Sequence, residues 1–509
     1  MTKHMETELK LRCSDVNTWE KIMEAEALVN VAVPGSEVMQ QLEARYFDTP
    51  GHALQKARLA YRLRREGDNW VATVKSGGSS HGGLHARMEW NVAVLDNEPD
   101  VGAFAHTEIG QKLQDVVGNE RLEPVLITFF ERKTVDVIMP DGSAIEVAAD
   151  KGAIIAGEKT EPILEIELEL KAGHPGALFM LGSALAREFS LLPEPDSKFY
   201  RGLLLAGLAV ARKQNNLVPR VDTAKPVGEA SSMLLIDLII QITVAQRRLL
   251  EEPQQPELVH ELRSCLWRLR SVLEFFEPFN VIKQYAYYQE QLKQVTQRLA
   301  KLRELDVAYG AWLQFQNSYT GKADSKAWLG DVLTETRNQE MENVMGELGA
   351  GLATPLLLSL WAELLDRDWQ QFTAPLNTAG EYVHSGLAGW IKKMRKEAEP
   401  VDWMDTGRVH HLRMEIKKVR YIVEVMQPAL SESSRLVEQL GKLQDTLGII
   451  TDAQSTEILR KSLLRGKSSK GMHLEAGMLI GWQIHEQLLL QKKLNKIWKK
   501  LNRIVKKWR

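Results

Sequence analysis

The sequence predicts an α+β protein in which a β-rich segment precedes an all-helical one. Stretches of alternating polar and apolar residues recur over residues 1–205, and this alternation is lost over 206–230. From residue 231 onward, apolar residues recur every three or four positions. A period of two is typical of strands and a period of 3.6 is typical of helices. We therefore expect a β domain over 1–205, a linker over 206–230 and a helical domain of two related bundles over 231–509.

The composition is that of an ordinary globular chain, with 509 residues, 44% of them hydrophobic, and a formal net charge of −2. This charge indicates no specific nucleic-acid partner. Cys13 and Cys265 are the only cysteines and lack ligand spacing, so we expect neither a disulfide framework nor a thiolate metal site. No apolar run approaches the ~20 residues of a membrane span, and we expect a cytoplasmic protein without one.

The expected strands carry a polar and an apolar face each. They are Ala60–Arg65, Trp70–Lys75, Arg87–Val92, Val125–Glu131, Ala144–Asp150 and Pro162–Lys171. Turn sequences such as Pro140-Asp141-Gly142 separate them. We expect helices near Val16–Val29 and Gly176–Leu192.

Two of the alternating stretches are strongly acidic. Glu165, Glu167 and Glu169 share one strand face, about 7 Å apart, so adjacent carboxylates repel by roughly 2–2.5 kcal/mol at an effective dielectric near 20. At the N-terminus, Glu6 and Glu8 share a face in the same way. If the two strands meet, their oxygens form a cluster that suits Mg²⁺ or Mn²⁺. The alternative is the solvated face of an open antiparallel sheet, where screening removes most of the repulsion.

Charges of both signs occur on the polar faces of the expected strands, which favours a closed barrel with a charged interior over an open sheet. The expected acidic lining is Glu6, Glu8, Glu89, Glu146, Asp150, Glu165, Glu167 and Glu169. The expected cationic lining is Lys10, Arg62, Arg64, Lys75, Arg87, Arg132 and Lys198. Cations that bind phosphate beside carboxylates that bind metal are what a metal-bound polyphosphate requires.

The opening Glu6-Thr7-Glu8-Leu9-Lys10 resembles the ExExK signature of the CYTH superfamily, the triphosphate tunnel metalloenzymes. Further matches follow in family order: Tyr46-Phe47-Asp48-Thr49, Arg62-Leu63-Arg64, Lys75, Arg87-Met88-Glu89, Arg132, Asp150, Glu165-Ile166-Glu167-Leu168-Glu169 and Ser197-Lys198. The resemblance implies an eight-stranded antiparallel tunnel that binds triphosphates or nucleotides with divalent metal. We expect Mg²⁺, with Mn²⁺ as an alternative, at two ions per site.

The resemblance also implies a role for each matched residue. The implied phosphate ligands are Lys10, Arg62, Arg64, Lys75, Arg87, Arg132 and Lys198. The implied metal ligands are Glu6, Glu8, Asp150, Glu165, Glu167 and Glu169, and the expected catalytic residues are Lys10, Glu165, Glu167 and Glu169. Glu169 could bind metal or serve as an acid/base partner.

The helical segment contains a weak internal repeat. His260, Arg263, Arg268 and Arg270 recur with the same spacing as His410, Arg413, Lys418 and Arg420, with Lys417 added. Further on, Arg303-Glu304-Leu305-Asp306 corresponds to Ile449-Ile450-Thr451-Asp452. One such stripe is commonly a solvated basic face, but two at matched spacing favour an anion-binding groove between related bundles. The segment resembles the CHAD domain, which implies binding of inorganic polyphosphate. Trp267 occupies a position that is cationic in the second copy, so we expect weaker binding by the first copy.

Two remaining features have simpler interpretations. Residues 492–509 contain nine Lys or Arg and no acid, which favours a final bundle helix with one basic face over a membrane-surface or nucleic-acid helix. We expect His81 and His85 to be surface residues of a loop.

We expect the whole chain to hydrolyse inorganic triphosphate to pyrophosphate and phosphate, with metal ions that bind the phosphates and activate a water, and to bind inorganic polyphosphate through its helices. The alternatives are a nucleotide-using CYTH enzyme, such as an adenylate cyclase or a thiamine or nucleoside triphosphatase, and a non-catalytic polyphosphate-binding scaffold.

Overall fold

The computed structural model describes residues 2–67, 69–210, 218–279, 282, 284–318, 328–365, 378–398, 403, 405–430, 433–463 and 470–506. The chain divides into two compact units. The first, which we call the tunnel unit, is Met1–Asn215 with Gly349–Asp366, and the second, the helical unit, is Asn216–Leu348 with Arg367–Arg509. A short segment from the middle of the helical sequence therefore belongs to the tunnel unit. Part of the expected linker, residues 211–217, lies outside the described residues.

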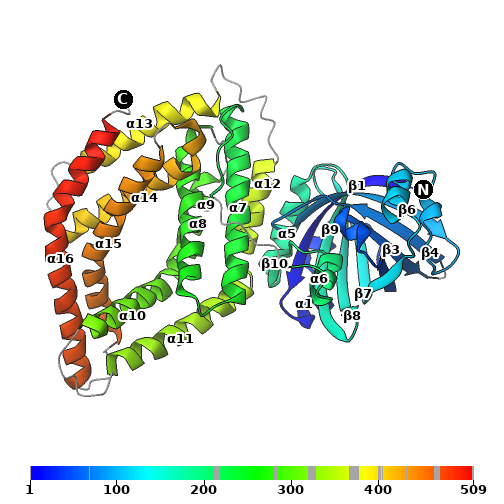
Figure 1. Ribbon diagram of the computed structural model, residues 1–509, viewed down its shortest axis with the longest axis horizontal. Helices are drawn as coiled ribbons and strands as arrows, with labels where there is room; N and C mark the ends of the chain where they lie inside the picture. Colours follow the sequence, from blue (N-terminus) through cyan, green and yellow to red (C-terminus); the bar gives the residue numbers. More distant parts are fainter. Residues whose placement is uncertain are drawn as a thin grey trace. The chain divides into compact units, whose positions relative to one another are not determined.

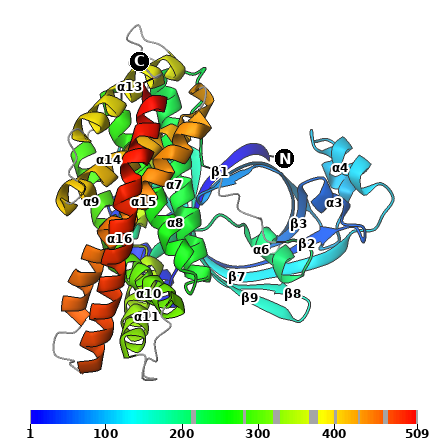
Figure 2. The same cartoon turned by 60° about the vertical axis from the view of Figure 1, so that its left-hand side comes forward.

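The tunnel unit is a closed antiparallel barrel (Figures 1 and 2). Its strands follow one another around the ring as β1 (Thr2–Cys13), β9 (Lys159–Ala172), β8 (Ala144–Ala156), β7 (Glu123–Ile138), β2 (Val38–Asp48), β3 (Leu59–Glu66), β4 (Asn69–Ser76) and β6 (Leu84–Val94). Pairing of β6 with β1 closes the ring. The short strands β5 (Ser79–His81) and β10 (Leu191–Pro193) pair beside it. The expected eight-stranded antiparallel fold is confirmed, although β2 was not among the expected strands.

Apolar residues on the outer face of the barrel are covered by helices. Leu9, Val147 and Leu168 are fully buried on this face. The helix α5 (Gly176–Glu188) packs there and ends four residues before its expected end, because β10 begins at Leu191. The single helix expected near the N-terminus is instead α1 (Val16–Lys21), η1 (Ile22–Glu24) and α2 (Glu26–Val29). On the other side of the barrel, α3 (Ala53–Lys56), η2 (Val101–Phe104) and α4 (Gly110–Val117) cover β3, β4 and β6.

A helix from much later in the chain completes this core. Helix α12 (Thr354–Leu365) packs on α5, where the rings of Phe179 and Trp361 stack with centroids 4.5 Å apart. The Ser183 hydroxyl donates a hydrogen bond of 2.8 Å to the carbonyl oxygen of Pro355. The tunnel unit is therefore built from two separate stretches of sequence.

Helix α6 (Lys198–Leu205) packs against an apolar part of the barrel interior. Ser197 caps it by accepting a hydrogen bond from the backbone of Tyr200. Leu203 joins a cluster with Leu126 and Ile154. A Cβ on Gly202 would lie 2.5 Å from the Leu126 side chain, so this close approach requires a glycine. The helix thereby brings Lys198, at its first turn, to the charged part of the interior.

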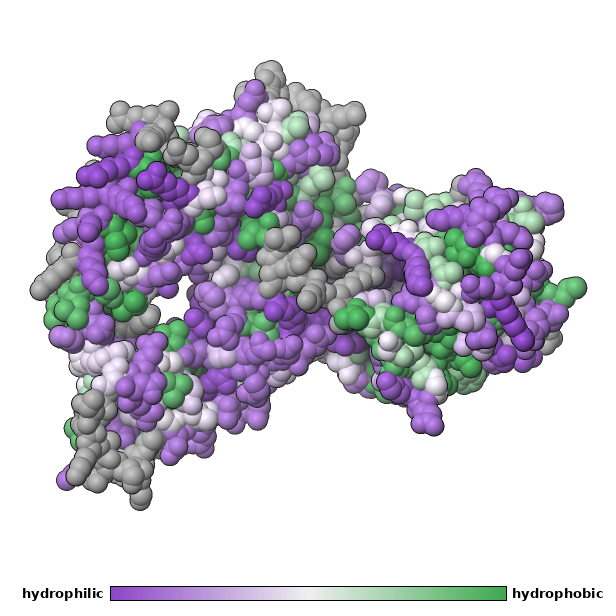
Figure 3. All heavy atoms as spheres, in the orientation of Figure 1, coloured by the Kyte–Doolittle hydropathy of each residue, from purple (hydrophilic) through white to green (hydrophobic). Residues whose placement is uncertain are grey.

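The helical unit contains no strand among its described residues, as expected. Its elements are α7 (Val227–Glu251), α8 (Pro256–Phe275), η3 (Glu277–Phe279), α9 (Tyr285–Arg298), α10 (Ala300–Ser318), α11 (Trp328–Gly349), α13 (Ala379–Glu397), α14 (Thr406–Val425), η5 (Gln427–Ala429), α15 (Ser433–Leu463) and α16 (Lys470–Val505). Helices α8 and α14, which carry the two copies of the basic motif, pack against each other. Hydrophilic residues predominate over the face of this unit drawn in Figure 3.

Two helices bear on the expectations about membranes. On α16, Leu494 and Leu501 are fully buried and Trp498 is 9% exposed, as in a bundle helix. Among the described residues, α7 alone is long and apolar enough to span a membrane, and half of its apolar window is buried within the protein. Helices α11 and α12 meet the same criterion only as a pair bent by 43°. Core helices meet these criteria too, so this is weak support for a span.

Candidate active site and anion-binding cluster

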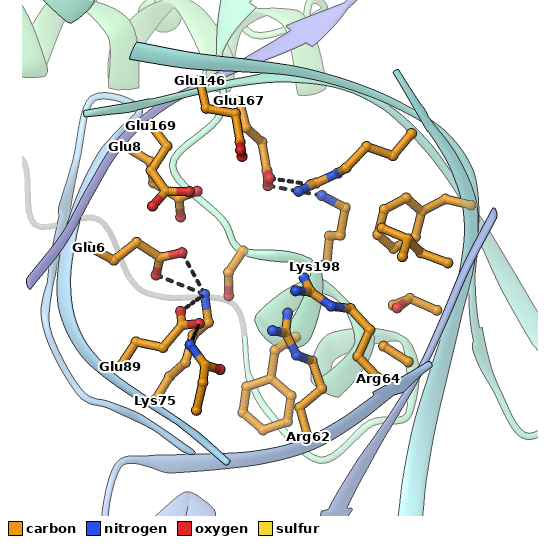
Figure 4. A pocket seen from close by; sticks show the side chains of 18 of the residues that line it. Glu6, Glu8, Arg62, Arg64, Lys75, Glu89, Glu146, Glu167, Glu169 and Lys198 are labelled. Carbon is orange, nitrogen blue, oxygen red and sulfur yellow. Dashed lines mark hydrogen bonds and ion pairs between the residues drawn. The ribbon is translucent and has the colours of Figure 1, made fainter. Parts of the chain in front are cut away.

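The barrel interior contains a cavity of about 410 Å³. Among the described residues, eight cationic and seven acidic side chains line it. Figure 4 shows that the signs are partly separated, with Lys75 lying among the carboxylates. Glu6, Glu8 and the glutamates of β8 and β9 lie on one side, and Arg62 and Arg64 project from the facing strand β3. The cavity therefore presents a carboxylate face opposite a guanidinium face.

The carboxylate face follows from the strand register. Glu8 on β1 lies opposite Glu169 on β9, and Glu169 lies opposite Glu146 on β8. Burial, followed by repulsion from Glu6 and Glu146, raises the pKa of Glu169 although Lys171 lies 3.0 Å away. This corner therefore retains uncompensated negative charge. Oxygen-only donors with surplus negative charge are the environment that Mg²⁺ and Mn²⁺ favour.

Lys75 compensates part of this charge. Its Nζ lies 2.7 Å from both carboxylate oxygens of Glu6 and 2.6 Å from Glu89. Burial opposes ionisation of Glu89, but Lys75 and Arg62 hold its pKa below the ordinary value. Burial and the neighbouring Glu8 and Glu89 raise the pKa of Glu6 despite Lys75. One lysine thus serves two buried carboxylates, and Glu6 remains the less stabilised anion.

A second acidic group lies deeper in the wall. Asp150, Glu165 and Glu167 are buried, and each offers an oxygen within 4.8 Å of the others, a spacing that could hold a metal ion. Lys198 Nζ already lies 2.7, 2.5 and 2.9 Å from these three carboxylates in that order. Arg132 donates to both oxygens of Asp150, at 2.7 and 2.6 Å. The group therefore forms a compensated network around Lys198.

The remaining oxygens of this network are also occupied. Glu167 accepts from Lys10 and, at 2.5 Å, from Arg132, and Glu165 accepts from Arg201 at 2.8 Å. Although burial opposes ionisation, Lys10, Lys198 and Arg132 hold the pKa of Glu167 well below its ordinary value. A metal ion here would have to displace several ammonium and guanidinium groups. The carboxylates of this network therefore have more close cationic partners than Glu6 and Glu169, which pair with Lys75 and Lys171 respectively.

The two arginines of the guanidinium face differ in how well their charge is compensated, since nearby Tyr46, Glu89 and Glu6 raise the pKa of Arg62 despite its burial. Arg62 donates to the Thr73 hydroxyl at 3.2 Å, but its buried Nε has no hydrogen-bond partner among the described residues. Arg64 is paired with Glu66 at 2.7 Å. Burial, followed by repulsion from Arg62 and Arg132, lowers the pKa of Arg64. An anion in the cavity would relieve this repulsion and supply the missing acceptors.

The expectation that His85 lies on the surface is wrong, whereas His81 is exposed as expected. His85 is 1% exposed and accepts a hydrogen bond of 2.8 Å from Arg87 at Nδ1. Its Nε2 lies 3.0 Å from the carbonyl oxygen of Glu194, so these partners define a neutral tautomer protonated at Nε2. Burial, with Lys10 and Arg87, lowers its pKa well below the ordinary value. His85 therefore orients Arg87, and its position two residues before Arg87 on one strand could have indicated this.

Two further charged residues were missed. Arg201 follows Lys198 by three residues and so shares its helix face, and it binds Glu161 and Glu165 at 2.7 and 2.8 Å. Lys171 follows Glu169 by two residues and shares its strand face. Both spacings could have indicated that Arg201 and Lys171 lie at the site, but no role was predicted for either residue.

The basic motifs of the helical unit supply the members of one cluster. Around Lys417, which is on α14, lie Arg263 from α8, Arg413 and Arg420 from α14, and Arg303 from α10. Burial and these four guanidinium groups lower the pKa of Lys417 well below its ordinary value. The buried Nε atoms of Arg263 and Arg413 have no hydrogen-bond partner among the described residues. We call these five residues the cation cluster; Arg303 was not expected in it.

His260 lies against the cation cluster, but other members of the expected stripes have different partners. Arg270 stacks on Trp267 at 4.9 Å and donates to Gln289 at 3.3 Å. His410 interacts with Arg413 and the neighbouring His411. The side chain of Asp452, the second-copy equivalent of Asp306, lies outside the described residues.

Arg268 and Lys418 form ion pairs instead. Arg268 on α8 lies 3.2 Å from Glu424 on α14, and Lys418 on α14 lies 3.0 Å from Glu274 on α8. Arg268 and Lys418 are 150 positions apart in the sequence, and so are Glu274 and Glu424. The contacts are therefore reciprocal, as in an interface with two-fold symmetry. They join the two repeats.

The closed barrel, with carboxylates facing arginines in its interior, defines a triphosphate-tunnel type of domain, and the helical repeats define a second module. The model of the CYTH domain matches residues 4–202, and that of the CHAD domain matches residues 235–460. The chain therefore contains a CYTH domain followed by a CHAD domain.

Individual relatives cover only parts of the chain. An inorganic triphosphatase from Haemophilus influenzae is 36% identical over 160 residues, which are 31% of this chain and 44% of that protein. The match thus spans less than half of that relative. The CHAD domain from Ricinus communis is 20% identical with a TM-score of 0.48, over 56% of this chain and 94% of that one. The PH1819 protein from Pyrococcus horikoshii is 18% identical with a TM-score of 0.26, over 39% and 98%.

Proposed function

We propose that the tunnel unit hydrolyses inorganic triphosphate to pyrophosphate and phosphate in the presence of Mg²⁺ or a similar divalent ion. The observation that supports this most is the opposition of an acidic corner and an arginine face across one enclosed cavity. A triphosphate with its metal carries both signs of charge and complements both faces. The similarity to the inorganic triphosphatase of Haemophilus influenzae supports the same substrate.

In this proposal each group of residues has a distinct task. Glu6 and Glu169 hold the metal because their pKa values stay raised despite their lysine partners, and Glu8 joins them because it lies opposite Glu169 in the strand register. A bound divalent ion would neutralise phosphate charge and lower the pKa of a water. Arg62 and Arg64 bind phosphate oxygens from the opposite face through charge-assisted hydrogen bonds.

The buried network positions the cations instead of binding metal. Asp150 and Glu165 hold Lys198 and Arg132 at the edge of the cavity. Those two cations line the cavity, whereas the two carboxylates lie behind them. Lys198 and Arg132 can then donate to phosphate oxygens without reorganisation, which is how preorganised charge lowers a barrier. Lys10, Lys75 and Arg87 complete the phosphate-binding set.

Phosphate release from tripolyphosphate, ATP, thiamine triphosphate and long-chain polyphosphate, each with and without Mg²⁺, tests the proposal. We expect fastest release from tripolyphosphate and none without divalent metal. Faster turnover of ATP or thiamine triphosphate would instead favour a nucleotide-using or thiamine-using enzyme. Absence of turnover with all four substrates would favour the scaffold alternative.

For the helical unit, we propose binding of inorganic polyphosphate at the cation cluster. Five cationic side chains lie together there, and buried guanidinium nitrogens lack acceptors within the described structure. A polyanion supplies both the charge and the acceptors. Equilibrium titration of the full chain with long-chain polyphosphate tests this, and affinity should decrease steeply with salt because many screened contacts contribute.

A further inference from the structure

A second cavity of about 530 Å³ adjoins the first. The two cavities share lining residues, among them Lys75, Arg87 and Ser197, so they lie side by side along these side chains. Strand β5, the turn before it and helix α6 contribute to this second space, which we call the outer chamber. Lys75 and Arg87 therefore lie at the boundary between the tunnel and the outer chamber.

The lining of the outer chamber differs in kind from that of the tunnel. No carboxylate is among the described residues that line it, whereas seven line the tunnel cavity. It presents cations, among them Arg58, together with the hydroxyls of Ser76 and Ser79. Without acidic side chains the chamber lacks the carboxylate oxygens that Mg²⁺ and Mn²⁺ favour. Its chemistry suits an anion that carries no metal, and a neutral base or sugar would leave the cations without acceptors.

Arg58 occupies a backbone position that favours glycine. Its φ is +58°, in the left-handed region, which is uncommon for residues other than glycine. The turn at residues 76–80 packs directly on it, since a Cβ on Gly77 would lie 2.9 Å from the Arg58 Cβ. Arg58 is exposed and forms no ion pair within the described part of the chain. The left-handed backbone ends helix α3, and it places an unpaired arginine at the edge of a cationic chamber, where the side chain is available to bind an anion.

We propose that the outer chamber binds the phosphate groups of an inorganic oligophosphate beyond the third, and that Arg58 is the cation dedicated to them. The inference rests on the proposed triphosphatase activity of the same tunnel. The tunnel binds the metal-bearing triphosphate portion, and the outer chamber binds the metal-free extension. Tetrapolyphosphate is the shortest ligand that would use both spaces.

The variant Arg58→Gly tests this proposal without disturbing the fold. Glycine adopts a positive φ without strain, so the variant should unfold at the same or a higher temperature than the wild type. We expect kcat/KM for tetrapolyphosphate to fall about tenfold, the loss of one charge-assisted contact, with kcat/KM for tripolyphosphate changed less than twofold. Arg58→Lys should restore most of the loss. Arg65→Ser, which removes an exposed arginine that lines neither cavity, serves as the matched control.

Each outcome has a defined meaning. Equal losses for both substrates would show that Arg58 only attracts anions, and no loss for either would remove Arg58 from binding; both results overturn the inference. If the wild type does not hydrolyse tripolyphosphate, the proposed function fails, and calorimetric titration with the two anions tests the chamber alone. If Arg58→Gly then loses affinity for tetrapolyphosphate alone, the inference about the outer chamber is supported. If the variant and the wild type bind tetrapolyphosphate equally, the inference is overturned.

Discussion

The Nζ of Lys417 lies 4.8 Å from the centre of the Trp267 ring, and these two residues occupy equivalent positions of the two helical repeats. A lysine at both positions would place two ammonium groups against each other. The tryptophan instead offers a ring face that attracts the lysine. Trp267, at the position where the second copy has Lys417, therefore stabilises the cation cluster. The expectation that the first copy binds polyphosphate less strongly stays a prediction.

The first prediction concerns Lys417. Lys417→Met should weaken polyphosphate binding by about ten- to a hundredfold, because it removes a buried charge from the cation cluster. The same change should raise the stability of the free protein, since the lysine is surrounded by like charges. Lys418→Met is the matched control, because Lys418 is paired with Glu274 and should contribute little to affinity. Calorimetric titration measures both variants, and equal losses would show that the cluster has no special role.

The second prediction is that polyphosphate binding becomes stronger as pH falls. Burial, with Arg303 and Lys417 next, lowers the pKa of His260 to about 4 in the free protein. A bound polyanion would favour the protonated forms of His260 and Lys417, so binding should take up protons. Titration in buffers of different ionisation enthalpy measures this uptake. Binding without proton uptake, at an affinity independent of pH, would contradict it.

His260 should also make the stability of the helical unit depend on pH. Because the pKa of His260 is about 4 in the folded protein and 6.5 in the unfolded chain, the unfolded chain binds more protons between these values. The free energy of unfolding of the helical unit should therefore decrease as pH falls from about 6.5 to 4. Chemical unfolding with and without polyphosphate measures this, and the bound polyanion should reduce the decrease.

The third prediction separates the metal corner from the buried network. Glu8→Gln should raise the Mg²⁺ concentration needed for half-maximal activity by at least tenfold, because it removes a proposed ligand. Glu66→Gln is the control, since Glu66 pairs with Arg64 and should leave the Mg²⁺ requirement unchanged. The metal-free Glu8→Gln protein should be no less stable than the wild type, since Glu8 contributes to the repulsion that raises the pKa of Glu6. An unchanged Mg²⁺ requirement would exclude Glu8 as a ligand.

The strand faces in the tunnel unit were predictable because side chains alternate with a fixed period of two. That period placed Glu6, Glu8 and Glu169 on the interior surface. It could not show that Glu165 is enclosed by Lys198 and Arg201, because both cations come from a helix that packs into the barrel. Burial of His85 was also hidden, since a polar residue beside glycines is more typical of an exposed turn.

In the helical unit, spacing identified the basic motifs but not how they are used. Arg268 and Lys418 have the same periodicity as Arg263 and Arg413. Only the packing of α8 on α14 shows that the first two are neutralised by glutamates of the opposite repeat. Arg303 reaches the cluster from α10, and no local pattern connects that helix with the others.

The fourth prediction concerns Lys198. Lys198→Met should destabilise the tunnel unit by about 3–5 kcal/mol, because three buried carboxylates would lose a shared cation. Arg62→Met should cost less stability, since Arg62 forms no ion pair within the described contacts and acts on Glu89 only at longer range, yet it should weaken triphosphate binding. Urea unfolding of both variants, followed by tryptophan fluorescence, gives the comparison. Similar losses of stability would show that the network around Lys198 is not specially dependent on it.

The last prediction concerns the helix that the tunnel unit takes from later in the chain. A fragment of residues 1–210 contains every proposed ligand of the tunnel, but it lacks α12 and so exposes the face of α5 that carries Phe179. Because large buried aromatic side chains contribute about 3–5 kcal/mol each, we expect the fragment to be unstable and prone to aggregate. Adding a peptide of residues 349–365 should restore both its solubility and its triphosphatase activity, whereas the same peptide with Trp361→Ala should not. A fragment that is as stable and active alone as with the peptide would show that α12 is dispensable, and that the two units can be separated at the end of α6.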